Sequence, residues 1–439
     1  MFSFIFYGWW DWRFIFLIIG SGLIDFFAAR AIYRYQRYKK LFLLISILGN
    51  IGSLMVFKYL GFLAENIEML FAQFGQQTEL TSTINPFFLI LPVGISFYTF
   101  QSMSYTIDIY KGKLKPTRHI LHFFAYLSMF PQLVAGPIIR ARDFLPQLNK
   151  TQKITETERW NGLQIIVYGF FKKMVLADNI APMVNSAFAN THMVDSSLYW
   201  WIVIIGFSFQ IYFDFSGYSD IARGLAKWMG FHFRTNFNHP YLSLSLKEFW
   251  TRWHISLSTW FRDYVYIPLG GSKKGKYNAH LFMWITMLVS GLWHGAAWTF
   301  VVWGAIHAFY MSLERITKFP DRLQKLPLGK LWSLLVVNLL VLISWVFFRA
   351  QQIDEAWFIL QQMFSFSGAH IPSGDAAFNG ICYCVIALGI EIGVWYKLDF
   401  LMALAARRKR WLNTIFIGIL IALCIILRGE GNQFIYFQF

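Results

Sequence analysis

The amino-acid sequence predicts an all-α protein that crosses a membrane many times. Only 14% of its 439 residues are charged, whereas soluble domains carry about 25%. Phenylalanine and tryptophan are abundant, with 47 and 19 residues. Several apolar runs approach the ~20 residues that a helix needs to cross a bilayer. Because a bilayer core contains no water, such segments must satisfy their own backbone hydrogen bonds, which favours helices.

Ten apolar segments are expected to span the membrane. They are residues 13–30, 41–60, 87–109, 162–181, 199–222, 279–295, 297–315, 331–349, 377–396 and 411–427. Basic clusters occupy the loops at 34–40, 111–119, 270–276 and 407–410, whereas 61–86 and 182–198 contain neither Lys nor Arg. The positive-inside rule assigns the basic loops to the cytoplasm and both termini to the outside.

The net charge of +16 does not indicate a nucleic-acid partner. The cations are dispersed among short loops, and no folded polar domain presents a basic face. Cys382, Cys384 and Cys424 lie in apolar runs, so we expect neither a disulfide framework nor a cysteine metal site. The start of the chain lacks the basic region and cleavage site of a signal peptide, and the first helix is expected to be retained.

Two segments do not fit simple spans, and the fourth span contains two lysines. Residues 120–136 form a marginal apolar run broken by Pro131, which indicates a re-entrant or buried segment. Residues 238–270 are rich in Trp, Tyr, Ser and Arg, and resemble an amphipathic segment in the interface or inside the protein. Lys172 and Lys173 fall inside the fourth span, so this helix either lines a polar cavity or lies partly outside the hydrocarbon.

Polar residues are most frequent between Tyr212 and His307. Asp214 lies within an apolar span, where a carboxylate is costly unless it is paired. Two interpretations remain open. Asp214 either fixes helix packing through buried hydrogen bonds, or lines a substrate channel and orients a catalytic partner.

A second polar group follows in "FWTRWHISLSTWFRDYVYIPLGG", residues 249–271. If this stretch is one helix, Trp253 and Trp260 share a face, whereas His254, Ser258 and Arg262 form a polar stripe at intervals of four. An interfacial aromatic belt explains the tryptophans. It does not explain an imidazole.

His294 stands in "VSGLWHGAAWTF", between a tryptophan and a glycine. A helix that starts near residue 279 places it about 22 Å along its axis, beyond the middle of a hydrocarbon core of about 30 Å. A neutral imidazole there is a candidate general base. The alternative is a hydrogen-bonded core histidine, as expected for His307. No carboxylate or cysteine stands at ligand spacing from these histidines, so no metal site is expected.

Several long motifs resemble one family of enzymes. They are "QIYFDFSGYSDIARGLAKWMGF", "RWHISLSTWFRDYVYIPLGG", "SGLWHGAAWTFVVWG" and the terminal "FIYFQF". Together they are similar to the membrane-bound O-acyltransferase (MBOAT) family, in its bacterial polysaccharide branch. The likeness extends over most of the chain, as "PVGISFYTFQSMSYTIDIY" and "FPQLVAGPIIR" illustrate.

The resemblance implies a single transmembrane domain over residues 1–439, with its catalytic portion at 87–316. It implies about 10–12 membrane helices, with re-entrant and interfacial helices around a central funnel. The family's invariant histidine falls on His294 and its second polar position on His254, the expected catalytic pair. The residues expected to bind substrate are Trp293, Arg252, Trp253, Ser258, Arg262 and Asp214.

The resemblance also implies the reaction and its setting. Acetyl-CoA is the expected donor, and no cofactor is expected. The acetyl group would pass through a bacterial inner membrane to a periplasmic acetyltransferase partner or an envelope polysaccharide such as alginate or peptidoglycan, with lipid around the helices. A lipid or protein O-acyltransferase is the alternative within this class. A transporter or non-catalytic scaffold is the alternative outside it, although the chain lacks the internal repeats that many transporters show.

Overall fold

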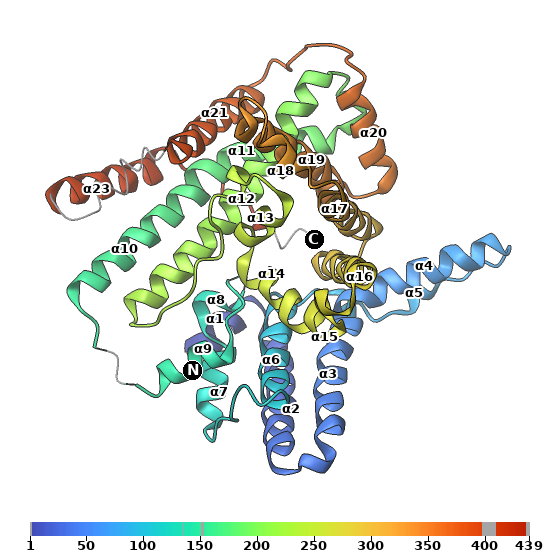
Figure 1. Cartoon of the computed structure of the whole chain (residues 1–439), viewed down its shortest axis with the longest axis vertical. Helices are drawn as coiled ribbons and strands as arrows, with labels where there is room; N and C mark the ends of the chain where they lie inside the picture. The colour runs from blue at the N-terminus through green and yellow to red at the C-terminus, as the bar shows by residue number, and fades with distance from the viewer. Residues whose placement is uncertain (1, 135, 151–152, 397–409, 436–439) are drawn as a thin grey trace. The chain divides into compact units, whose positions relative to one another are not determined.

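The computed structural model describes residues 2–134, 136–150, 153–396 and 410–435 (Figure 1). Within these ranges the regular structure is helical and contains no β-strand, which confirms the all-α prediction. Among them, five helical segments are long and apolar enough to cross a bilayer: Phe2–Arg34, Gln36–Gln73, Ser197–Trp228, Gly329–Arg349 and Asp375–Trp395. The protein is therefore a multi-pass membrane protein. The basic residues at 407–409 lie outside the described ranges.

The chain forms two compact units, Met1–Glu158 with Ala226–Phe233, and Arg159–Leu225 with Arg234–Phe439. The first unit contains α1 (Phe2–Asp11), α2 (Ile15–Arg34), α3 (Lys39–Leu54), α4 (Leu60–Gln73), α5 (Leu80–Thr83), α6 (Ile95–Tyr110), α7 (Ile120–Leu127), α8 (Phe130–Leu133) and α9 (Ala141–Leu148).

A buried carboxylate joins three helices of the first unit. Asp25 on α2 accepts hydrogen bonds from Ser46 Oγ (2.5 Å) and Asn50 Nδ2 (2.8 Å) on α3, and from Ser102 Oγ on α6. Asp25, Ser46, Asn50 and Ser102 are all buried. Because a buried carboxylate is tolerated only when it is hydrogen-bonded, this network fixes how α2, α3 and α6 pack together (Figure 1).

The predicted span at 87–109 begins too early. A short 3-10 turn covers Pro86–Leu89, and α6 starts only at Ile95. Gly94 has a φ of 75°, and a Cβ there would overlap the carbonyl oxygen of Leu133. The run at 120–136 is likewise divided into α7 and α8, with Pro131 in the first turn of α8, where proline is tolerated.

The second unit contains most of α10 (Glu156–Phe170) and α12 (Ser197–Trp228), and the helices that follow. They are α11 (Asp178–Ala189), α13 (Leu246–Arg252), α14 (Ile255–Phe261), α15 (Ile267–Leu269), α16 (Lys276–His294), α17 (Trp298–Thr317), α18 (Phe319–Leu323), α19 (Gly329–Arg349), α20 (Ile353–Phe364), α21 (Asp375–Trp395) and α23 (Arg410–Ile426). The segment at 238–270, predicted as one amphipathic segment, is instead a series of short helices. Each of the ten predicted spans overlaps a helix.

Helices α16 and α17 form an antiparallel pair whose backbones touch. A Cβ at Gly291 would overlap the carbonyl oxygen of Phe300, and a Cβ at Gly304 would overlap that of Met287. Small residues permit such an approach between membrane helices. The pair is therefore fixed by direct backbone contact, at the end of α16 that carries His294.

Replacing either glycine should separate the pair. Gly291→Ala and Gly304→Ala are each expected to lower the free energy of unfolding by about 1–3 kcal/mol, the usual range for overpacking. Thermal unfolding of the purified protein in detergent measures this. Gly389→Ala on α21 is the control, because a Cβ there meets no atom within 4 Å. An unchanged melting temperature for both interface variants would contradict the close approach.

Candidate active site

His294 is the last residue of α16. Only 5% of its surface is exposed. Three aromatic rings surround the imidazole, with centroids 5.0 Å (Trp293), 5.0 Å (Trp303) and 5.2 Å (Phe348) from its own. The end of the helix therefore holds a polar ring inside an aromatic enclosure.

His254 lies between α13 and α14, and its backbone is left-handed, with φ 40° and ψ 55°. The residue is fully buried, with its ring centroid 4.6 Å from that of Phe215 and 6.0 Å from that of Phe237. The two helices beside it, α13 and α14, have seven residues each and are too short to span a bilayer, so His254 lies outside the membrane-spanning helices. Burial lowers the pKa of His254 from its usual value to about 3, because loss of water disfavours the charged ring. The imidazole is therefore neutral near pH 7.

Trp293 connects the two histidines. Its ring centroid lies 6.2 Å from that of His254 and 5.0 Å from that of His294. The structure thus brings together the two predicted catalytic residues and one predicted substrate-binding residue. Their chemical roles stay predictions.

The predicted polar stripe of His254, Ser258 and Arg262 is wrong at its first member. The stripe assumed one continuous helix, but α13 ends at Arg252 and α14 begins at Ile255. The same break separates the two tryptophans expected to share a face. Ser258 and Arg262 line a cavity, whereas His254 is not among its lining residues.

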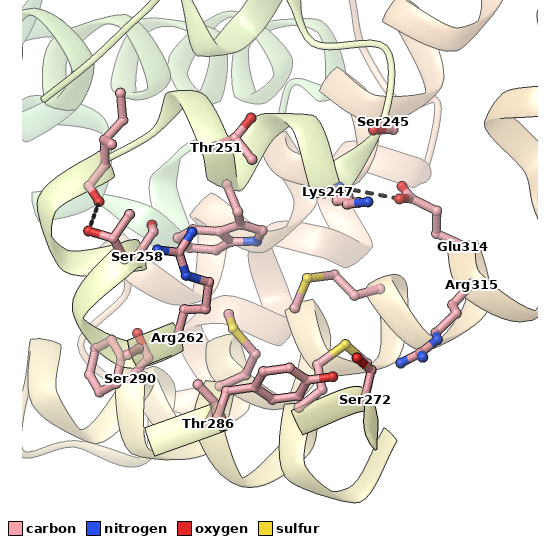
Figure 2. A pocket seen from close by; sticks show the side chains of 18 of the residues that line it. Ser245, Lys247, Thr251, Ser258, Arg262, Ser272, Thr286, Ser290, Glu314 and Arg315 are labelled. Carbon is pink, nitrogen blue, oxygen red and sulfur yellow. Dashed lines mark hydrogen bonds between the residues drawn. The ribbon is translucent and has the colours of Figure 1, made fainter. Parts of the chain in front are cut away.

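The cavity has a volume of about 1000 Å³ and is lined by residues of the second unit (Figure 2). Its charged lining residues are Lys247, Arg262, Arg315, Lys318, Glu314 and Asp321. Arg262 and Arg315 lie on opposite sides of it in Figure 2. Arg262 is paired with the neighbouring Asp263 at 2.9 Å. The other three cations still outnumber the two lining carboxylates, and several hydroxyl groups lie among them, so the cavity favours an anionic ligand.

One face of α16 forms a wall of this cavity. Met283, Thr286, Met287 and Ser290 line it, at the spacing of neighbours on one helix face. Ser290 precedes His294 by four residues, which is about 6 Å along a helix axis. The cavity therefore extends along α16 to within about one turn of the histidine.

Glu314 on α17 fixes the start of α13. The backbone N–H groups of Leu246 and Lys247 donate to its carboxylate at 2.6 Å and 3.2 Å, as Figure 2 shows for Lys247. Ser245 Oγ accepts from the N–H of Glu248 at 3.0 Å. These bonds satisfy amides that have no partner within the helix, so the cavity wall holds α13 in place.

Two predicted substrate-binding residues stabilise α13 instead of lining the cavity. Arg252 pairs with Glu248 at 2.7 Å. Trp253 is buried, with 1% of its surface exposed, and its ring centroid lies 5.1 Å from those of Phe237 and Trp345. Both side chains thus support the segment that leads to His254.

Asp214 belongs to a buried ion cluster. Lys173 Nζ lies 2.8 Å from Asp214 and 2.7 Å from Asp178, and the N–H of Ile435 donates to Asp214 at 2.7 Å. Lys172 pairs with Asp220 at 2.7 Å. These contacts favour the packing interpretation of Asp214. Lys172 and Lys173 thus form ion pairs inside the protein. The sequence had suggested that they line a polar cavity or lie outside the hydrocarbon, and ion pairing was not considered.

Sequence reasoning missed several functional candidates. Lys247, Arg315 and Lys318 were not singled out, although they line the cavity. Glu314 was not considered, and neither was Asn236, which holds the start of α14. One signal was available in "LERITK", where Glu314 precedes Lys318 by four residues. This spacing places a carboxylate and a cation together at the end of α17. In the described part of the chain, no group of three or more His, Cys, Asp or Glu residues could hold a metal ion.

A multi-pass helical protein that encloses histidines beside a cavity with several charged lining residues has the features of a membrane-embedded enzyme. The sequence profile of the membrane-bound O-acyltransferase family matches residues 114–350. This range includes both histidines and the whole cavity lining.

Individual relatives agree with this match. The chain is 38% identical to the probable alginate O-acetylase AlgI of Azotobacter vinelandii, covering 88% of this chain and 77% of that protein. It is 32% identical to the peptidoglycan O-acetyltransferase of Helicobacter pylori, covering 84% and 73%. It is 31% identical to the teichoic acid D-alanyltransferase of Bacillus subtilis, covering 57% and 66%. The chain belongs to the MBOAT family and is an O-acyltransferase, which favours an enzyme over a transporter or scaffold.

The buried His254 predicts acid sensitivity of the fold. The unfolded chain binds a proton there near pH 6.5, but the folded chain does so only near pH 3. This contribution to stability is therefore complete above about pH 6.5 and is lost as the pH falls towards 3. His254→Gln should reduce the loss of stability between about pH 6.5 and 5 by up to about 1.4 kcal/mol per pH unit.

Thermal unfolding across this pH range measures the effect. His370→Gln, which changes an exposed loop residue, should leave the pH dependence as in the wild type. The same pH dependence in His254→Gln and the wild type would show that His254 is not held neutral by burial.

Proposed function

We propose that this protein is a membrane O-acetyltransferase that moves an acetyl group from cytoplasmic acetyl-CoA to a hydroxyl group on the far side of the membrane. The observation that carries the proposal is the cation-rich cavity that follows α16 to within one turn of His294. Two of the relatives are named for O-acetylation of alginate and of peptidoglycan. They support acetyl as the transferred group and an envelope polysaccharide as the final acceptor.

The cavity suits the donor. Lys247, Arg262, Arg315 and Lys318 offer positive charge to the phosphate groups of coenzyme A. Ser272, which also lines the cavity, belongs to the basic loop at 270–276. The positive-inside rule assigns this loop to the cytoplasm, where acetyl-CoA is available. The thioester would then lie further along α16, towards His294.

The proposed reaction needs one base and good positioning. The acceptor oxygen attacks the thioester carbonyl while His294 takes the hydroxyl proton, so a C–O bond forms as the C–S bond breaks. The thiolate of coenzyme A leaves and receives the proton from the imidazolium. The aromatic enclosure of His294 excludes water, which limits hydrolysis of the thioester.

His254 and Trp293 complete the proposed site. His254 is neutral, so one ring nitrogen can donate a hydrogen bond and the other can accept one. It would orient the donor or the acceptor, with Trp293 packed between the two imidazoles. In this proposal the protein lies in the bacterial inner membrane with both termini outside, and an exported acetyltransferase passes the acetyl group on to the polysaccharide.

His294→Gln tests the catalytic role directly. Loss of the general base should lower the rate of transfer from labelled acetyl-CoA at least about 100-fold, with the melting temperature close to that of the wild type. The assay uses protein in liposomes with alginate oligosaccharide or peptidoglycan fragments, with and without the exported partner. His307→Gln is the matched control, a fully buried histidine on α17, and should remain active. Equal activity of His294→Gln and the wild type would refute the proposal.

Arg315→Met tests the donor site. Removing one phosphate contact should raise the KM for acetyl-CoA about tenfold, equivalent to about 1.4 kcal/mol, and leave kcat nearly unchanged. Arg322→Met removes a cation of α18 that is not among the cavity-lining residues, and its KM should match the wild type. If both variants keep the wild-type KM at low and high salt, the cavity does not bind the donor phosphates.

A further inference from the structure

The left-handed backbone of His254 requires an explanation. A side chain with a Cβ rarely adopts this conformation, and it persists only where surrounding contacts determine it. His254 starts α14 but makes no side-chain capping bond to the helix. Another group must therefore hold the first turn of α14.

Asn236 supplies that group from a loop eighteen residues earlier. The N–H of Ile255 donates to the backbone oxygen of Asn236 at 2.8 Å, and the N–H of Ser256 donates to its Oδ1 at 3.1 Å. These are the first two amides of α14, which have no partner within the helix. Asn236 thus caps the helix in place of His254.

The other end of the Asn236 side chain is anchored to α12. Its Nδ2 donates to Ser219 Oγ at 3.1 Å, and only 3% of Asn236 is exposed. Both polar atoms of the amide are therefore used, one towards α14 and one towards α12. A side chain held at both ends has little freedom to move.

The loop that contains Asn236 also binds the chain on the other side of His254. The N–H of Asn238 donates to the carbonyl oxygen of Arg252 at 2.9 Å. Between these residues, Phe237 packs its ring against His254. Residues 236–238 thus hold the backbone two residues before the histidine and at the two residues that follow it.

The geometry points to Asn236 as a positioning residue for the transfer reaction: it fixes the left-handed backbone at His254 and so directs the imidazole towards Trp293 and His294. This inference rests on the proposed function for the role of His254. Asn236 itself touches neither donor nor acceptor in this scheme. It acts through the peptide groups of Ile255 and Ser256.

Asn236→Ala removes the side-chain cap and is the first test. Amide exchange measured by mass spectrometry should show a loss of protection of about tenfold or more in the peptide that covers residues 255–258. The kcat of acetyl transfer should fall about 10–100-fold, with the KM for acetyl-CoA changed less than twofold. In a protein that already carries His254→Ala, adding Asn236→Ala should lower kcat by less than a further factor of two, because Asn236 acts through His254.

Two variants separate positioning from general destabilisation. Asn236→Asp keeps an oxygen for the Ser256 amide and should keep the protection and a kcat within about threefold of the wild type. Asn338→Ala removes hydrogen bonds to the carbonyl oxygens of Tyr241 and Leu334, and should lower the melting temperature without changing kcat.

The outcomes distinguish this inference from the proposed function. Unchanged protection of residues 255–258 in Asn236→Ala would overturn the inference. It would also be overturned if Asn236→Ala lowered kcat in the His254→Ala background as much as it does in the wild type. An active His294→Gln enzyme would refute the proposed general base, whereas the exchange experiment would still report whether Asn236 holds the backbone at His254.

Discussion

The need to satisfy every backbone polar group away from water governs this structure. Regular helices meet that need by themselves, so irregular backbone is tolerated only where protein groups replace water. The helix breaks beside His254 and His294 are such places. At α13, Glu314 takes the first amides, and at α14 Asn236 does so. The candidate site is therefore built where the helices are interrupted, and side chains from elsewhere in the sequence support the starts of α13 and α14.

Charge is distributed in three different ways. Asp25 is surrounded by hydroxyl and amide donors, and Asp214 is matched by Lys173. In both arrangements the carboxylate is bound by groups of the protein itself, so these two residues stabilise helix packing. In the cavity, by contrast, cations exceed carboxylates, and an incoming anion can supply the missing charge. His254 and His294 lie among aromatic rings, and burial lowers the pKa of His254, so its neutral form is favoured.

The sequence predicted the features that depend on composition and on long motifs. The apolar runs gave the helices, and the motifs around His254 and His294 predicted the residues that the structure brings together at Trp293. Prediction from the sequence failed where hydrogen bonds from distant residues determine the local backbone conformation. Nothing in "RWHIS" indicates that the helix stops before His254, because the bonds on either side of the break come from Asn236 and Asn238. The ion pairs of Asp214 with Lys173 and of Arg252 with Glu248 were not predicted either, and the substrate-binding roles of Asp214 and Arg252 stay predictions.

The backbone contact between α16 and α17 has a mechanical consequence. Bilayers differ in thickness, and membrane helices adapt by tilting. Glycine has no rotamers, so the contact at Gly291 and Gly304 has no softer alternative geometry. The two helices must therefore tilt as one rigid body. His294 and the cavity wall at Ser290 and Glu314 belong to this pair, so their spacing should stay constant in membranes of different lipid composition.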